Sequence, residues 1–183
     1  SAKKASLLLK NNNSKIIILP GFIAQDERGS TTTLGRGGSD YTASLLANYL
    51  DASILEIWTD VSGVYTANPK LVNQAQPISN LSFQEAMELS HFGAKVIYPP
   101  TLQPLIEKNI PLRIKNTFDT SSKGTLISTN NFKNIENSIV KGVSHIENVS
   151  LINLEGSGMI GIPGFSSRFF ECLSEKKINI IMI

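Results

Sequence analysis

A glycine-rich turn leads into a helix-like segment within Thr31–Leu50. The stretch Gly35–Gly38 is glycine at every position except Arg36. Residues without a Cβ atom let backbone N–H groups come close to a ligand, and a guanidinium binds a carboxylate or phosphate through a planar fork. The helix N-terminus expected after the turn adds positive potential. These residues therefore predict a site for a small anion.

Two polar residues, Ser39 and Asp40, stand at the expected N-cap of this helix, and apolar residues follow at helical spacing (Ala43, Leu46, Ala47 and Leu50). Asp40 could cap the helix or orient Arg36, and the spacing leaves both roles open. A plain tight turn is the alternative, which the density of glycine and arginine disfavours. The turn lacks the Gly-Lys-Ser/Thr of a P-loop, and Asp40 replaces the third glycine of the dinucleotide-binding fingerprint.

A second group of candidate residues follows the apolar run Ile54–Val61, which is expected to form a strand. Thr59 and Asp60 close this run, and ligands of open α/β sheets bind beyond the carboxyl ends of strands. The next loop offers Tyr65 as a ring for a base or sugar and Lys70 as a cation for phosphate. A Ser-Gly turn with a solvated lysine is an equally supported alternative.

Lys95 lies at the end of a later helix-like segment, where a lysine also suits the helix dipole. His91 and His145 have no partner at metal-ligand spacing and receive no role.

Strands and helices are expected to alternate along the first part of the chain. Continuous apolar runs predict buried strands at 15–23, 54–61 and 111–115, with helices over 39–51, 83–97 and 102–109 between them. The second helix begins at a capping box formed by Ser82 and Glu85. This order predicts an α/β fold with a mainly parallel sheet.

The composition changes near Ser128, where a polar, asparagine-rich stretch predicts a linker over 129–139. A second α/β pattern follows, with strands expected at 149–154 and 178–183 and a helix at 166–176. Because the sequence stops inside an apolar strand, we expect a segment of a longer protein. Gly156–Gly161 matches G-x-G-x-x-G, but Pro163 delays the helix that the dinucleotide motif needs. The loop could instead bind a small amino acid.

The overall composition excludes several classes of function. Apolar residues make up 41% of the 183 residues and the net charge is +2, with scattered lysines and no basic stripe for nucleic acid. Cys172 is the single cysteine, which excludes a disulfide framework or a cysteine metal site. No stretch is long enough to span a membrane, and no signal peptide is recognisable, so a cytoplasmic location is expected.

Three motifs, GRGGSD (35–40), WTDVSGVYTANP (58–69) and FGAKVIYPPTL (92–102), closely resemble those of the aspartokinases in order and spacing. The resemblance implies the amino acid kinase fold, a three-layer αβα sandwich that is only partly present here. Residues 140–183 resemble the opening βαβ half of an ACT-like regulatory domain. The implied organisation is residues 1–128 for the C-terminal part of the catalytic domain, 129–139 for the linker and 140–183 for the regulatory part. Several motifs favour a bifunctional aspartokinase–homoserine dehydrogenase.

The resemblance implies transfer of the γ-phosphoryl group of ATP, with Mg2+, to the side-chain carboxylate of L-aspartate. The product is 4-phospho-L-aspartate, the first step towards lysine, threonine and methionine. The matching positions for aspartate are Arg36, Gly37, Gly38 and Ser39, with Asp40 as the catalytic position that supports the loop; those for ATP are Thr59, Asp60, Tyr65, Lys70, Lys95 and Val96; those for a feedback effector, threonine or lysine, are Met159, Gly161, Gly164, Phe165 and Ser166. No residue is assigned to a metal, and pairing of ACT units predicts a homo-oligomer.

The sequence departs from the family in one respect. It lacks the Lys-x-Gly-Gly-Thr-Ser segment and an upstream glutamate, so we expect this segment alone to have little or no activity. Two alternatives stay open, namely an amino-acid-sensing module on a kinase-like scaffold and another amino acid kinase, such as one acting on glutamate.

Overall fold

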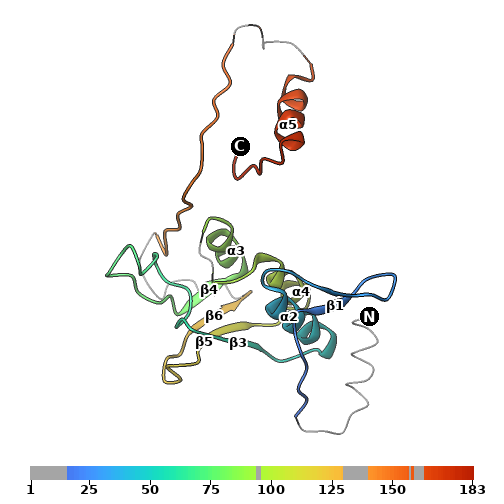
Figure 1. The fold of residues 1–183 in the computed structure, drawn as a ribbon. Helices are drawn as coiled ribbons and strands as arrows, with labels where there is room; N and C mark the ends of the chain where they lie inside the picture. The colour runs from blue at the N-terminus through green and yellow to red at the C-terminus, as the bar shows by residue number, and fades with distance from the viewer. Residues whose placement is uncertain (1–15, 94–95, 130–139, 157, 159–162) are drawn as a thin grey trace. The chain divides into compact units, whose positions relative to one another are not determined.

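The computed structural model describes residues 16–93, 96–129, 140–156, 158 and 163–183 (Figure 1). The chain divides into two compact units, with the division after Glu147, and each unit is described here by itself. The segment 140–147 therefore packs with the first unit. The domain boundaries given by the resemblance, at 128 and 140, stay predictions. No helix of the described residues is long and apolar enough to cross a membrane.

A four-stranded sheet forms the centre of the first unit. Its strand order is β3 (Leu55–Thr59), β5 (Leu112–Asn116), β6 (Thr125–Ser128) and β4 (Asn80–Ser82). The pairs β3–β5 and β4–β6 are parallel, whereas β5 and β6 are antiparallel because a short turn joins them directly. The expected α/β fold is confirmed, and β6 and β4 run opposite to β3 and β5.

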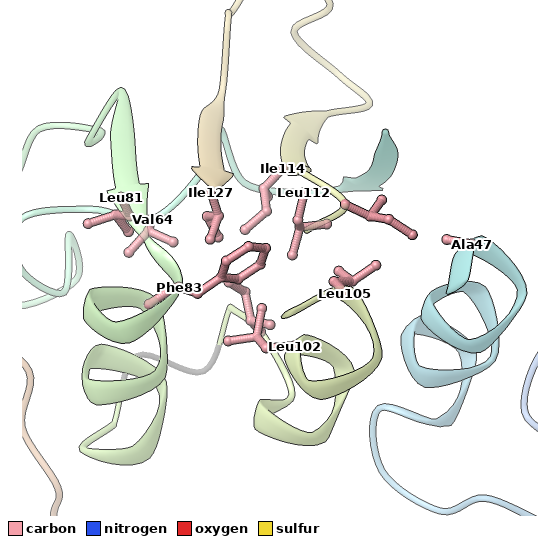
Figure 2. Packing of buried hydrophobic residues seen from close by; sticks show 12 residues of the cluster. Ala47, Val64, Leu81, Phe83, Leu102, Leu105, Leu112, Ile114 and Ile127 are labelled. Atoms are coloured by element: carbon pink, nitrogen blue, oxygen red, sulfur yellow. The ribbon is translucent and has the colours of Figure 1, made fainter. Parts of the chain in front are cut away.

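Three helices cover one face of this sheet, namely α2 (Gly38–Leu50), α3 (Phe83–His91) and α4 (Leu102–Lys108), the last preceded by the 3-10 turn η1 (Pro99–Thr101). Figure 2 shows their side chains meeting those of the strands; the buried apolar cluster comprises Ala47, Val64, Leu81, Phe83, Ala86, Ile97, Leu102, Leu105, Ile110, Leu112, Ile114 and Ile127. Odd and even positions of the strands alternate between this core and the opposite face. On that opposite face Lys115 Nζ lies 4.5 Å from the centroid of the Trp58 ring, and Trp58 is 46% exposed.

Helix α3 begins at the predicted capping box. Glu85 N donates to Ser82 Oγ (3.1 Å), and Ser82 N donates to Glu85 Oε2 (2.8 Å). The helix ends at His91, six residues before its predicted end, because Gly93 has a φ of +119° that no helix continues through. Lys141 Nζ lies 2.7 Å from Glu85 Oε1, which fastens the segment 140–147 to this helix.

The predicted buried strand at 15–23 is wrong for the residues that the structure describes. Residues 16–20 have no regular secondary structure, and Ile18 is 91% exposed. Regular pairing begins only at β1 (Ile23–Gln25), which forms an antiparallel hairpin with β2 (Thr31–Thr33). An apolar run is buried only where neighbouring strands pair with it, and among the described residues none pairs with 16–20.

Among its described residues the second unit contains one helix, α5 (Phe165–Glu175), within one residue of the predicted 166–176. The predicted strands at 149–154 and 178–183 are not formed in the structure, and Leu151 is 97% exposed. Isolated strands are not stable without a sheet to join, and the described residues of this unit contain no ladder. No residue of α5 is buried.

Candidate functional site

The glycine loop turns into α2 at Gly37. Its φ of +71° makes Gly37 the N-cap, without a side-chain cap, so the prediction of Ser39 or Asp40 at that position is wrong. Ser39 and Asp40 lie in the first turn instead, because Gly37 can adopt the left-handed conformation that ends the loop. The first amides of a helix have no partner within it. Gly38 N donates back to the Gly35 carbonyl (3.1 Å), so the amides that follow it are the ones that this turn can present to an anion.

The two charged residues of the loop differ in their surroundings. Arg36 is exposed, whereas Asp40 is half-buried in the first helical turn. Burial raises the pKa of the Asp40 carboxyl above its ordinary value of 3.8. A guanidinium beside the helix N-terminus can bind a carboxylate, and Asp40 supplies a carboxyl group within the same turn.

Residues 20–22 pack against the first turn of α2. A Cβ atom on Gly21 would lie 3.0 Å from Ser39 Cα, and one on Gly38 would lie 3.1 Å from Phe22 Cδ2. Phe22 has a φ of +72°, and its N–H donates to Thr42 Oγ1 (3.2 Å), which donates in turn to the Gly38 carbonyl (2.8 Å). A left-handed phenylalanine costs about 1–3 kcal/mol and is characteristic of functional sites. The sequence pattern did not reveal this residue.

Thr59 and Asp60 lie at the carboxyl end of β3, as predicted. Thr59 Oγ1 donates to Asp60 Oδ1 (3.1 Å), and Thr117 N donates to the Thr59 carbonyl (2.8 Å). The next loop is held by Asn116, whose Nδ2 donates to Ser62 Oγ (3.0 Å). Sequence reasoning missed Asn116; the available signal was an amide side chain at the end of a buried strand.

The loop that carries Tyr65 is held by buried Thr125. Val64 N donates to Thr125 Oγ1 (2.8 Å), which donates to the Ile78 carbonyl (2.6 Å). Tyr65 pairs with Pro77 in an isolated bridge, so its backbone is fixed across the loop. Thr125, a buried polar residue within a strand, was also missed.

The remaining predicted residues are less closely tied to this region. Lys70 is exposed in an Asx turn, with its N–H donating to Asn68 Oδ1 (3.0 Å). Val96 packs partly against the core, and Lys95 lies outside the described residues. In the second unit Gly164, with a φ of +80°, is the N-cap of α5, which begins with Phe165 and Ser166. Met159 and Gly161 lie outside the described residues.

Two of these groups meet at the start of α2. A Cβ atom on Gly37 would lie 2.7 Å from Cδ1 of Tyr98, the residue before η1, so the glycine loop and the start of η1 are in contact. Strand β5 lies parallel to β3 with Thr59 opposite Asn116, so the carboxyl ends of these two strands lie side by side.

A resident metal cluster is absent from the described part of the chain, where no three His, Cys, Asp or Glu side chains could hold an ion together. The site is instead built from backbone amides, hydroxyl groups and isolated charges. This arrangement can bind and orient anionic groups.

Two family models match the chain. Residues 1–116 match the amino acid kinase family, and residues 152–183 match an ACT domain. A bifunctional aspartokinase/homoserine dehydrogenase of Haemophilus influenzae is 48% identical over 169 residues, which cover 92% of this chain and 20% of that protein.

Two solved structures of Escherichia coli aspartokinase III are also similar, each at 37% identity. The complex with aspartate and ADP (R-state) has a TM-score of 0.74 and covers 100% of this chain and 40% of that one. The complex with lysine and aspartate (T-state) has a TM-score of 0.68 and covers 95% and 39%. The chain thus spans about a fifth of the length of the bifunctional relative and two fifths of the solved chains.

Proposed function

Since this chain belongs to the amino acid kinase family, we propose that it is the part of an aspartokinase that binds L-aspartate and contributes to the ATP site. The whole protein transfers the γ-phosphoryl group of ATP to the side-chain carboxylate of aspartate. The observation that carries this proposal is the glycine loop beside Arg36, which leads into the N-terminus of α2 and contacts the start of η1. The similarity to a protein solved with aspartate and ADP supports it.

The substrate part of the proposal rests on the start of α2. The Arg36 guanidinium and the amide of Ser39 bind a carboxylate of aspartate, whereas Gly38 N already donates to the Gly35 carbonyl (3.1 Å) and holds the loop in shape. Asp40 is the proposed catalytic position. It is half-buried in the first turn of α2, next to the proposed carboxylate-binding donors, and burial raises the pKa of its carboxyl.

The nucleotide part rests on Thr59, Asp60 and Tyr65, with Lys70, Lys95 and Val96 assigned to ATP through the resemblance. Phosphoryl transfer requires positioning and charge neutralisation more than covalent chemistry. Mg2+ enters with the ATP phosphates, since a Mg2+ ion needs only one or two carboxylates besides phosphate and water. Asp60, at the end of β3, is a suitable carboxylate for this purpose.

Regulation is assigned to the second unit, because residues 152–183 match an ACT domain. We assign the loop leading into α5 (Met159, Gly161, Gly164, Phe165 and Ser166) to an effector amino acid, lysine or threonine, and the ACT units to formation of a homo-oligomer. We propose a cytoplasmic location for the whole protein.

The test is hydroxylamine trapping of aspartyl phosphate by the full-length protein that carries this sequence, with Mg·ATP and L-aspartate. Arg36→Ala should raise the KM for aspartate by about tenfold or more, as expected for a lost charge-assisted hydrogen bond, and leave the KM for ATP nearly unchanged. Arg28→Ala, which removes another exposed arginine from the β1–β2 turn, is the matched control.

Three outcomes would contradict the proposal in different ways. An equal effect of Arg36→Ala on both KM values would overturn the carboxylate assignment. Faster reaction with glutamate than with aspartate would identify a different amino acid kinase. Absence of acyl phosphate, together with amino-acid binding, would favour the sensing module.

A further inference from the structure

The side chain of Tyr98 packs against the glycine loop. A Cβ atom on Gly37 would collide with Cβ and Cγ of Tyr98 and would lie 2.7 Å from its Cδ1. The tyrosine side chain therefore covers the backbone of Gly37 at the point where the loop becomes α2. Gly37 is required here for two reasons, its positive φ and the absence of space for any side chain.

Hydrogen bonds hold the backbone around Tyr98 in place. It is the N-cap of η1 with an extended backbone (φ −78°, ψ +117°), as expected for a residue that precedes Pro99. Its carbonyl accepts from Thr101 N (2.9 Å), and the Thr101 carbonyl accepts from Ser44 Oγ of α2 (2.6 Å). The element that carries Tyr98 is thus bonded back to the helix whose first turn Tyr98 touches.

The glycine loop needs the contact with Tyr98 because its own residues constrain its backbone conformation little. Glycine adopts positive and negative φ almost equally well, so the direction of the amides after Gly37 is not fixed by the chain alone. The bonds from Gly38 N to the Gly35 carbonyl (3.1 Å) and from Tyr41 N to the Gly37 carbonyl (3.0 Å) hold only if Gly37 keeps its conformation.

We propose that Tyr98 is a positioning residue for the aspartate loop, which it holds in its binding conformation through ring contact with Gly37. This inference rests on the proposed function. Because Tyr98 follows Val96 by two residues, it also connects the segment assigned to ATP with the loop assigned to aspartate. The ring carries this role, and the hydroxyl group is not required.

The experiment compares Tyr98→Ala, Tyr98→Phe and Tyr49→Ala in the full-length protein. Tyr98→Ala should lower kcat/KM for aspartate about ten- to a hundredfold, as small misplacements of binding groups do, and leave the KM for ATP nearly unchanged. Tyr98→Phe should restore wild-type values. Tyr49, also half-buried but in the last turn of α2, should affect stability without changing either KM.

A second measurement does not depend on the activity. In the full-length protein, Tyr98→Ala should increase amide hydrogen exchange over residues 34–42, and Tyr98→Phe should not. Unchanged exchange in this segment, or equal effects of Tyr98→Ala on both KM values, would overturn the positioning role. If the wild-type protein makes no aspartyl phosphate, the proposed function fails, and the exchange result still decides the inference.

Discussion

Helices α3 and α5 have nine and eleven residues, and each begins with a phenylalanine, yet their surroundings differ. Phe83 of α3 is buried between strands and helices of the first unit, whereas no residue of α5 is buried. An amphipathic sequence marks the face that a helix can bury, but most of its stability comes from the partner on that face. The first unit provides this partner within the chain, and the second unit does not among its described residues.

The largest expected difference between the units is the loss of stability on removing one phenylalanine side chain from each helix. Phe83→Ala should lower the free energy of unfolding by about 3–5 kcal/mol, since it leaves a cavity in a packed core. Phe169→Ala in α5 should cost less than about 1 kcal/mol, because the ring contacts Phe170 but lies in no core. Urea unfolding followed by circular dichroism measures both values. Equal losses would show that the second unit has a core of its own.

A glycine substitution tests how firmly residues 140–147 belong to the first unit. A Cβ atom on Gly93 would collide with the His145 carbonyl, so Gly93→Ala should cost about 2–4 kcal/mol from strain and crowding together. Gly35→Ala is the control, because Gly35 also has a positive φ (+72°) but no atom lies within 4 Å of such a Cβ. Limited proteolysis should then cut the 140–147 segment faster only in Gly93→Ala. Equal cutting in both variants would contradict the packing of this segment.

Removing the capping box should lower the stability by a smaller amount. Ser82→Ala removes the acceptor of Glu85 N and should cost about 1 kcal/mol, because a helix N-cap is lost. Helix α5 has no side-chain cap at Gly164, so Gly164→Ser is the corresponding change there and should shift the midpoint of the same urea transition very little. A Ser82→Ala variant as stable as the wild type would show that α3 is held by its packing alone.

The smallest expected effect concerns pH. Burial acts to raise the pKa of Glu85, but hydrogen bonds from Lys141 and Ser82 outweigh it, so the pKa lies below its ordinary value of 4.5. The resulting stabilisation is present above pH 4.5 and is lost as the pH falls through the folded-state pKa. The stability difference between wild type and Glu85→Gln should therefore shrink from about 0.5 kcal/mol at pH 7 towards zero in acid. A difference independent of pH would contradict the ion pair.

Local signals in the sequence were sufficient to predict the helices and two of the strands. The Ser82–Glu85 box and the apolar spacing of α2 depend on neighbouring residues, so they could be recognised directly. Strand β4 has three residues and is defined only by its pairing with β6, which no local pattern reveals. The prediction of a buried strand at the apolar run 16–20 is wrong for the opposite reason. Its pattern is strong, but the described residues supply no strand that pairs with it.

The residues of the candidate site likewise fall into those that the sequence predicts and those that only the fold reveals. Arg36, Thr59 and Asp60 could be proposed because glycine density and strand ends are visible in the sequence. Tyr98 and Phe22 could not, because their importance arises from contacts with Gly37 and Gly38 across the fold. Residue identity predicts the groups that bind, and the tertiary structure determines the residues that hold them in place.

The strand order of the sheet has a consequence for the way the chain folds. Among the described residues of the first unit, β6 is the last strand to be synthesised, yet it lies between β5 and β4. The described partner of β4 is β6, so this pairing waits until Thr125–Ser128 has left the ribosome, and until then the apolar faces of β4 and α3 lack it. Pairings that wait for a distant segment slow folding and leave apolar surface exposed meanwhile. We therefore expect the first unit to fold late in synthesis, after its family motifs have all emerged.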